Sequence, residues 1–118
     1  MAKVSIIIPS RNEKYLKRTV QDIYEKATGD FEVLVGYDGP PFQDLDSPPN
    51  LKVFESPEPI GLKAMINKLA EMATGKYIYK TDSHCMFGKG FDEILQADMQ
   101  DNWVVTPRFY VLNAEKWE

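Results

Sequence analysis

The segment KVSIIIPS, at positions 3–10, places four β-branched residues almost without interruption in front of a proline. A nearly continuous run of this kind is typical of a strand that is buried on both faces. Pro9 lacks an N–H group for the sheet ladder, so we expect the strand to end near it. A strand covered on both faces is characteristic of a mostly parallel sheet in an α/β domain.

The remaining patterns alternate between helices and strands. Apolar stripes with helical spacing predict helices over residues 12–29, 61–75 and 90–100, and β-type runs predict strands over 31–37, 51–55, 76–81 and 103–112. Asn12 and Gly29 are suited to cap the first helix, and Gly75 to stop the second. The order predicts a three-layer α/β/α fold with a mostly parallel central sheet.

Composition narrows the classes of protein. The chain has 118 residues, which suits a single domain, and its 43% hydrophobic and 27% charged residues are typical of a globular protein. A net charge of −4 argues against nucleic acid as a partner. The first apolar run is too short for a membrane span or a signal peptide, and the single cysteine gives no sign of disulfides. We expect a cytoplasmic location.

Polar residues follow three of the predicted strands. They are Pro9, Ser10, Arg11 and Asn12 after the first, Asp38 and Gly39 after the second, and Asp82, Ser83 and His84 after the fourth. Ligands of open α/β sheets bind beyond the carboxyl ends of the strands. The three clusters are therefore candidate parts of one site.

Asp82 and His84, the only histidine of the chain, are candidate metal ligands. Residues two apart in an extended segment point to the same side, so both side chains can face one ion. A carboxylate suits Mg²⁺ or Mn²⁺, and an added imidazole favours Mn²⁺. The alternative is a turn aspartate followed by a loop histidine without a ligand. Adjacent Cys85 is expected to be a small buried hydrophobe rather than a nucleophile.

The same clusters carry a resemblance to a known family. The stretches VSIIIPSRNE, FEVLVGYDGP and GLKAMINKLAEMATGKYIYKTDSH resemble, in this order, the nucleotide-binding half of glycosyltransferase family 2-like enzymes, which have the GT-A fold. Two departures stand out. Only the second acid of the family's Asp-Asp-Gly-Ser element is present, as Asp38. The family's Asp-x-Asp is here Asp82-Ser83-His84, similar to the Asp-x-His element of polypeptide N-acetylgalactosaminyltransferases.

The resemblance implies a nucleotide-diphospho-sugar donor, most simply a UDP-sugar, and Mn²⁺ or Mg²⁺ as cofactor. The nucleotide-binding residues it implies are Pro9, Ser10, Arg11, Asn12, Asp38, Gly61, Asn67 and Asp82. The resemblance also implies that Asp38 accepts a hydrogen bond from the imide N–H of the base, and that Asp82 and His84 hold the metal. Asp38 also has a simpler interpretation, because Asp-Gly followed by prolines is typical of a turn.

The acceptor side is the weakest part of the pattern. No carboxylate after residue 84 stands in a convincing position for a catalytic base, so the catalytic residues are unknown, and the acceptor-binding part is expected to be absent or shortened. Two functions stay open: a metal-dependent glycosyltransferase with an unknown acceptor, or a non-catalytic nucleotide-binding or interaction module with a truncated transferase fold. The β-prone segment 103–112 predicts self-association or a partner that completes the fold.

Overall fold

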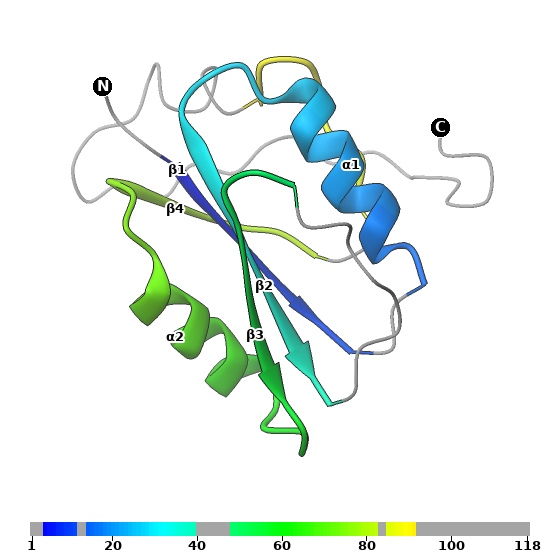
Figure 1. The fold of residues 1–118 in the computed structure, drawn as a ribbon, viewed down its shortest axis with the longest axis vertical. Coiled ribbons are helices and arrows are strands. Elements are labelled where there is room, and N and C mark those ends of the chain that lie inside the picture. Colours follow the sequence, from blue (N-terminus) through cyan, green and yellow to red (C-terminus); the bar gives the residue numbers. More distant parts are fainter. Residues whose placement is uncertain (1–3, 12–13, 40–47, 83–84, 92–118) are drawn as a thin grey trace.

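In the part of the chain that the structure describes, a four-stranded parallel sheet forms the centre (Figure 1). The structure, a computed structural model, describes residues 4–11, 14–39, 48–82 and 85–91. Within them the chain runs β1 (Val4–Ser10), α1 (Leu16–Lys26), β2 (Phe31–Asp38), β3 (Leu51–Ser56), α2 (Leu62–Met72) and β4 (Tyr77–Lys80), with the strand order β3-β2-β1-β4. All three strand pairings are parallel, which confirms the predicted α/β fold with a mostly parallel sheet.

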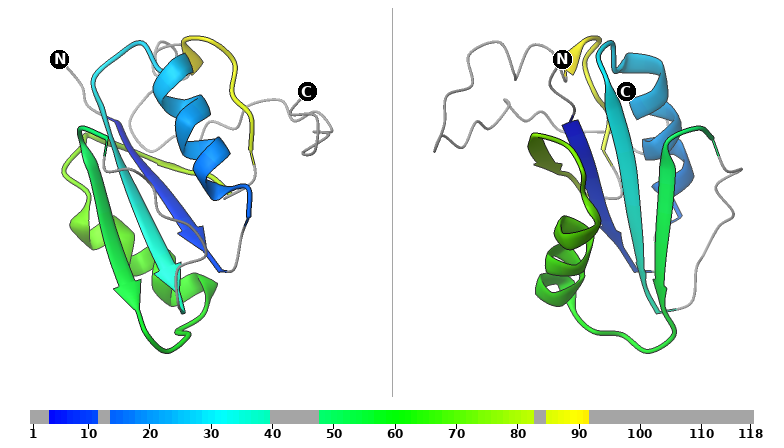
Figure 2. Two further views of the ribbon diagram at one scale, coloured as in Figure 1. Left: turned by 45° about the vertical axis from the view of Figure 1, so that its right-hand side comes forward. Right: turned by 60° about the vertical axis from the view of Figure 1, so that its left-hand side comes forward.

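The two helices cover opposite faces of the sheet (Figure 2). Alternation along the strands decides which residues meet which helix. On β2, Val33, Val35 and Tyr37 pack in the core that contains α1, whereas Leu34 packs with Met65 and Leu69 of α2. Because α1 covers one face of the sheet and α2 the other (Figure 2), the central strands β1 and β2 are buried almost throughout, as their composition predicts.

Helix α1 presents Leu16, Val20 and Ile23 to the sheet, at the spacing of one helical face. Its limits differ from the predicted ones. The helix begins at Leu16 rather than Asn12, which lies outside the described residues, and it ends at Lys26 with Ala27 as the extended C-cap residue. Gly29 is therefore not the cap, because the chain already leaves the helix before it.

Helix α2 lies unusually close to the sheet at one point. A Cβ atom on Gly36 of β2 would lie 2.3 Å from the sulfur of Met65, so only glycine leaves room for this side chain. Met65 and Leu69 are the buried residues of the helix, and Leu62, predicted as part of the apolar stripe, is exposed. The helix ends at Met72 with Ala73 as its cap residue, ahead of the predicted stop at Gly75.

Most of the elements predicted for the last part of the chain lie outside the described residues. Except for Gly90 and Phe91, the predicted helix over 90–100 lies outside the described residues, as does the strand region over 103–112. In the part of the chain that the structure describes, no helix is both long and apolar enough to cross a membrane.

Candidate functional site

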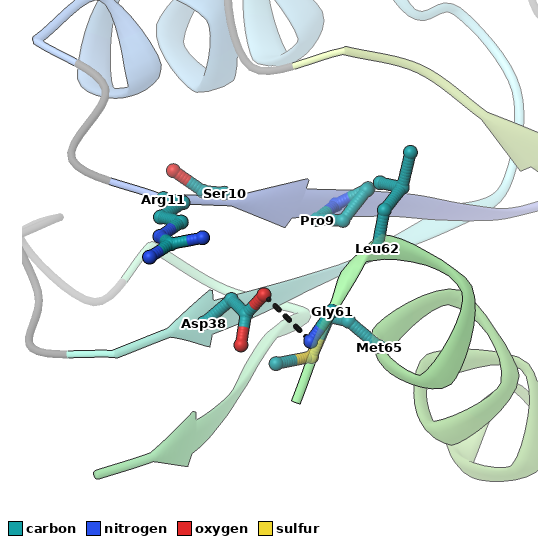
Figure 3. Close-up of a pocket in the computed structure, with 7 residues that line it drawn as sticks. All are labelled: Pro9, Ser10, Arg11, Asp38, Gly61, Leu62 and Met65. Carbon is teal, nitrogen blue, oxygen red and sulfur yellow. Dashed lines mark hydrogen bonds between the residues drawn. The ribbon is translucent and has the colours of Figure 1, made fainter. Parts of the chain in front are cut away.

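The carboxyl ends of the strands meet at one edge of the sheet, and a pocket opens there. Its volume is about 180 Å³. The lining residues come from the ends of β1 and β2 and from the start of α2: Pro9, Ser10, Arg11, Asp38, Gly61, Leu62 and Met65 (Figure 3). Five of the eight residues named above as nucleotide-binding, namely Pro9, Ser10, Arg11, Asp38 and Gly61, thus lie around one cavity.

Asp38 is the best-fixed polar residue of this pocket. The last residue of β2, it is buried, and its two carboxylate oxygens accept hydrogen bonds from successive backbone N–H groups. Oδ1 accepts from Ile60 at 2.5 Å. Oδ2 accepts from Gly61 at 3.1 Å, the hydrogen bond drawn in Figure 3. A carboxylate has about four lone-pair sites, so each oxygen retains acceptor capacity for a further donor.

The connection between β3 and α2 is built to meet this carboxylate. The N–H of Gly39 donates to the carbonyl of Ser56 at 2.9 Å, and the Ser56 hydroxyl donates to the carbonyl of Glu58 at 2.5 Å. Gly61 has φ of +93°, a conformation that residues with a side chain rarely adopt. This turn aims the N–H groups of residues 60 and 61 back at Asp38.

Met65 and Leu62 give the pocket its apolar wall. Met65 is fully buried and can lie against the sheet because Gly36 has no side chain. Leu62 is 59% exposed, which is unusual for a leucine and leaves an apolar side chain at the mouth of the cavity. From the sequence these two residues were predicted only as part of the apolar stripe of the helix. The signal that could have marked them is the glycine of β2 opposite the first turn of α2.

Arg11 and Ser10 supply the polar groups on the β1 side. Ser10 is buried at the end of the strand, and Arg11 is exposed just beyond it. Figure 3 shows the guanidinium group of Arg11 on the same side of the pocket as the carboxylate of Asp38. The cavity is therefore lined by a cationic group and an anionic group as well as by apolar side chains.

Asp82 lies at the same edge of the sheet but does not line this pocket. Ile7 of β1 pairs with Lys80 of β4, and the N–H of Thr81 donates to the carbonyl of Ile7 at 3.1 Å, so Asp82 comes directly after the paired part of the strand. Its side chain is exposed and lies 2.9 Å from the ammonium group of Lys80. His84, the other candidate ligand, lies outside the described residues.

Two further predicted residues are not brought into the pocket by described contacts. Asn67 is exposed on α2, between the buried positions Met65 and Leu69, and Asn12 is outside the described residues. Among the residues whose placement is described, no group of three or more His, Cys, Asp or Glu side chains could hold a metal ion. Cys85 packs against the core but is only partly buried, whereas a buried position was expected from the sequence.

Taken together, a parallel sheet covered by helices on both faces and a pocket beyond the carboxyl ends of its strands define the class of open α/β domains, whose ligands bind at this edge of the sheet. The sequence model of glycosyl transferase family 2 matches residues 5–118, and the chain therefore belongs to this family.

The fold is also similar to a solved structure, the crystal structure of S. aureus TarS 1-349. The TM-score is 0.68 and the sequence identity 21%, and the match covers 90% of this chain. It covers 38% of the TarS chain, so the present chain spans well under half the length of that protein. At this identity the likeness bears on the GT-A-type fold alone. No curated protein sequence matches the chain.

Proposed function

We propose that the chain binds a nucleotide-diphospho-sugar, with uracil as the base, in a metal-dependent manner and takes part in transfer of the sugar to an acceptor. The observation that carries the proposal is the pocket at the ends of β1 and β2, which both Asp38 and Arg11 line. Membership of glycosyl transferase family 2 makes a nucleotide-sugar donor and an acceptor the expected ligands.

The shape of the pocket suits the base rather than a whole nucleotide. Pockets for drug-sized ligands usually have about 300–1,000 Å³, whereas this one has about 180 Å³. Its apolar wall, with Leu62 and Met65, can pack against a flat ring. The ionised carboxylate of Asp38 can only accept hydrogen bonds, and it can therefore accept one from the imide N–H of uracil. Arg11, at the opening, is placed to pair with a phosphate, since guanidinium binds phosphate oxygens in a bidentate manner.

The metal would be held at the end of β4. The exposed carboxylate of Asp82 is a hard oxygen ligand of the kind that Mn²⁺ and Mg²⁺ take, and His84 is the second proposed ligand. A divalent ion bound there supplies positive charge for the negative charge that develops on the leaving diphosphate. Asp82 and the pocket are at the same edge of the sheet, which is consistent with a base in the pocket and a diphosphate near β4.

Calorimetric titration of UDP, with Mn²⁺ and with EDTA, tests the proposal. We expect tighter binding with Mn²⁺, and loss of this gain in Asp82→Asn and in His84→Ala. Asp30→Asn is the matched control, because Asp30 is an exposed aspartate that precedes β2 at the opposite edge of the sheet. Equal binding with Mn²⁺ and EDTA would rule out the metal-dependent site.

Two further probes separate the parts of the proposal. UDP methylated at N3 lacks the imide N–H, so it should bind at least several-fold more weakly than UDP if Asp38 reads the base. Slow release of free sugar from a UDP-sugar, stopped by Asp82→Asn, would show turnover. Binding of UDP without any turnover would instead favour the second candidate, a nucleotide-binding module.

A further inference from the structure

The chain that follows Asp82 is fastened to α1 by two buried side chains of that helix. The N–H of Cys85 donates to the hydroxyl oxygen of Thr19 at 3.0 Å, and the N–H of Phe87 donates to Oδ2 of Asp22 at 2.6 Å. Thr19 and Asp22 are polar, yet 0% and 5% exposed, on a face of α1 that otherwise carries Leu16, Val20 and Ile23. Buried polar groups at such positions need a reason beyond packing.

Lys26, one turn further along α1, completes this contact. Its ammonium group lies 3.2 Å from Oδ1 of Asp22 and donates to the carbonyl of Phe87 at 3.2 Å. Its own carbonyl accepts from the N–H of Gly90 at 2.7 Å. Both oxygens of Asp22 are therefore engaged, and the peptide on each side of Phe87 is held by a charged partner.

Apolar packing alone would not define the position of residues 85–91 along α1 as specifically as these hydrogen bonds do. Phe87 and Phe91 are buried in the core, with ring centroids 4.7 Å apart, and Phe91 meets Tyr79 of β4 edge-on at 5.6 Å. Aromatic packing of this kind fixes which face is buried. It does not set the register of the backbone, whereas hydrogen bonds to alternate N–H groups do so, since the N–H groups of residues two apart in an extended chain point the same way.

The position of this attachment along the chain is what links it to the site. The N–H of Thr81 is fixed to β1 through the carbonyl of Ile7, and the next described attachment is Cys85 to Thr19. Asp82 therefore lies in a short span with both flanks fixed to different elements. Backbone that is fixed on both sides of a ligand residue lowers the conformational entropy lost on binding, which is the usual source of a preorganised site.

We propose that Thr19 and Asp22 are positioning residues of the metal side of the donor site. They hold the backbone that follows Asp82 in register, so that this carboxylate is presented in one place when metal and diphosphate bind. The inference rests on the proposed function, because it assigns these residues a part in metal-dependent binding of the donor.

The test compares UDP affinity with Mn²⁺ and with EDTA in Thr19→Val and Asp22→Asn. Valine has the shape of threonine without the hydroxyl, and asparagine replaces one carboxylate oxygen by an amide donor that faces another donor. We expect each variant to lose about five- to tenfold of the Mn²⁺-dependent gain in affinity, the effect of one hydrogen bond, while the affinity in EDTA is unchanged. Thr19→Ser, which keeps the hydroxyl, should retain the gain, and so should Glu25→Gln, an exposed charge change on the same helix.

Amide hydrogen exchange provides a readout that does not depend on metal. In Thr19→Val the N–H of Cys85 should exchange faster, and in Asp22→Asn that of Phe87, while N–H groups of β1 stay protected. A wild-type chain without any Mn²⁺-dependent gain would overturn the proposed function and the inference together. A wild-type gain that persists in both variants, or a parallel loss of affinity in EDTA, would overturn the inference alone.

Discussion

Glu32 and Asp38, two acids of the same strand, hold the opposite ends of α2. Oε2 of Glu32 accepts hydrogen bonds from the N–H and the hydroxyl of Thr74, just after the helix, at 2.7 and 2.9 Å. Asp38 accepts from the N–H groups of residues 60 and 61, just before it. Both acids lie on the face of β2 that meets α2, since their positions differ by an even number and alternate residues of a strand share a face.

Stability should fall in acid because of Glu32. Burial alone would raise the pKa of this carboxyl group, but hydrogen bonds from Ser5 and Thr74 and the ammonium group of Lys52 outweigh it and lower the pKa from 4.5 to about 2. A pKa lowered by folding stabilises the protein above pH 4.5, and the contribution is lost as the pH falls towards 2. The full contribution to the free energy of unfolding is roughly 3 kcal/mol. Urea unfolding between pH 6 and pH 3 measures how this free energy declines as the pH falls.

The variant Glu32→Gln identifies the group responsible. It should lower the free energy of unfolding at pH 6 and flatten its decline between pH 4.5 and pH 3. Glu58→Gln serves as the control, because Glu58 is an exposed acid in the connection before α2. An acid transition that stays equally steep in Glu32→Gln would assign it to other carboxyl groups.

Replacing Gly36 should damage the fold and the pocket together. The added Cβ atom of Gly36→Ala would lie 2.3 Å from Sδ of Met65 and 3.1 Å from Leu69, so α2 or the Met65 side chain has to move. Overpacking of this kind costs about 1–3 kcal/mol. Gly88→Ala is the control, because its Cβ atom would meet nothing within 4 Å. Thermal unfolding of both variants, together with UDP titration, checks the prediction.

Asp38→Asn should loosen the start of α2. One of the two N–H groups at residues 60 and 61 would then face an amide NH₂ group instead of an oxygen, which costs about 1–3 kcal/mol for a buried donor. Faster amide exchange at Ile60 and Gly61, with unchanged exchange at Thr74, is the expected pattern. Slow exchange at both residues in the variant would show that the loop does not depend on the carboxylate.

Lys80 is expected to compete with a metal ion for Asp82. Its ammonium group lies 2.9 Å from Oδ1, and both side chains are exposed, so the pair adds little to stability. In Lys80→Gln the affinity for Mn²⁺ alone should rise about two- to fivefold at low salt, since a neighbouring positive charge is removed. Lys76→Gln, an exposed lysine just before β4, is the control. Equal Mn²⁺ affinity in all three proteins would contradict the expectation.

The order of the core elements along the chain could be predicted from local patterns, whereas the pairing of the strands was not predicted. The β-branched run at Ile6, Ile7 and Ile8 indicates a buried strand, and the stripe at Leu16, Val20 and Ile23 indicates one buried helix face. The ends of the helices were harder to predict. Both helices stop before the nearest glycine, because Ala27 and Ala73 leave the helix in an extended conformation that needs no glycine.

The pocket could be predicted in part. Residues 9, 10, 11 and 38 could be predicted as part of the pocket because the carboxyl ends of neighbouring parallel strands meet. The roles of Thr19 and Asp22 were not, because a polar residue within an apolar helix face gives no sign of a backbone partner that follows more than sixty positions later in the chain. For Asp38 the sequence left a turn and a base contact as alternatives. The structure adds a third role, because its carboxylate accepts hydrogen bonds from the backbone N–H groups just before α2.

Because contacts from β2 hold α2 in place, the α2 side of the pocket is less able to change its structure than the β1 side. One strand fixes both ends of this helix and Gly36 its middle, so the wall that carries Leu62 and Met65 can shift only if several buried contacts break at once. The β1 side ends in an exposed arginine. Adaptation to a different donor, in evolution or in the laboratory, is therefore expected to proceed through Arg11 and its neighbours, with α2 kept as a rigid template.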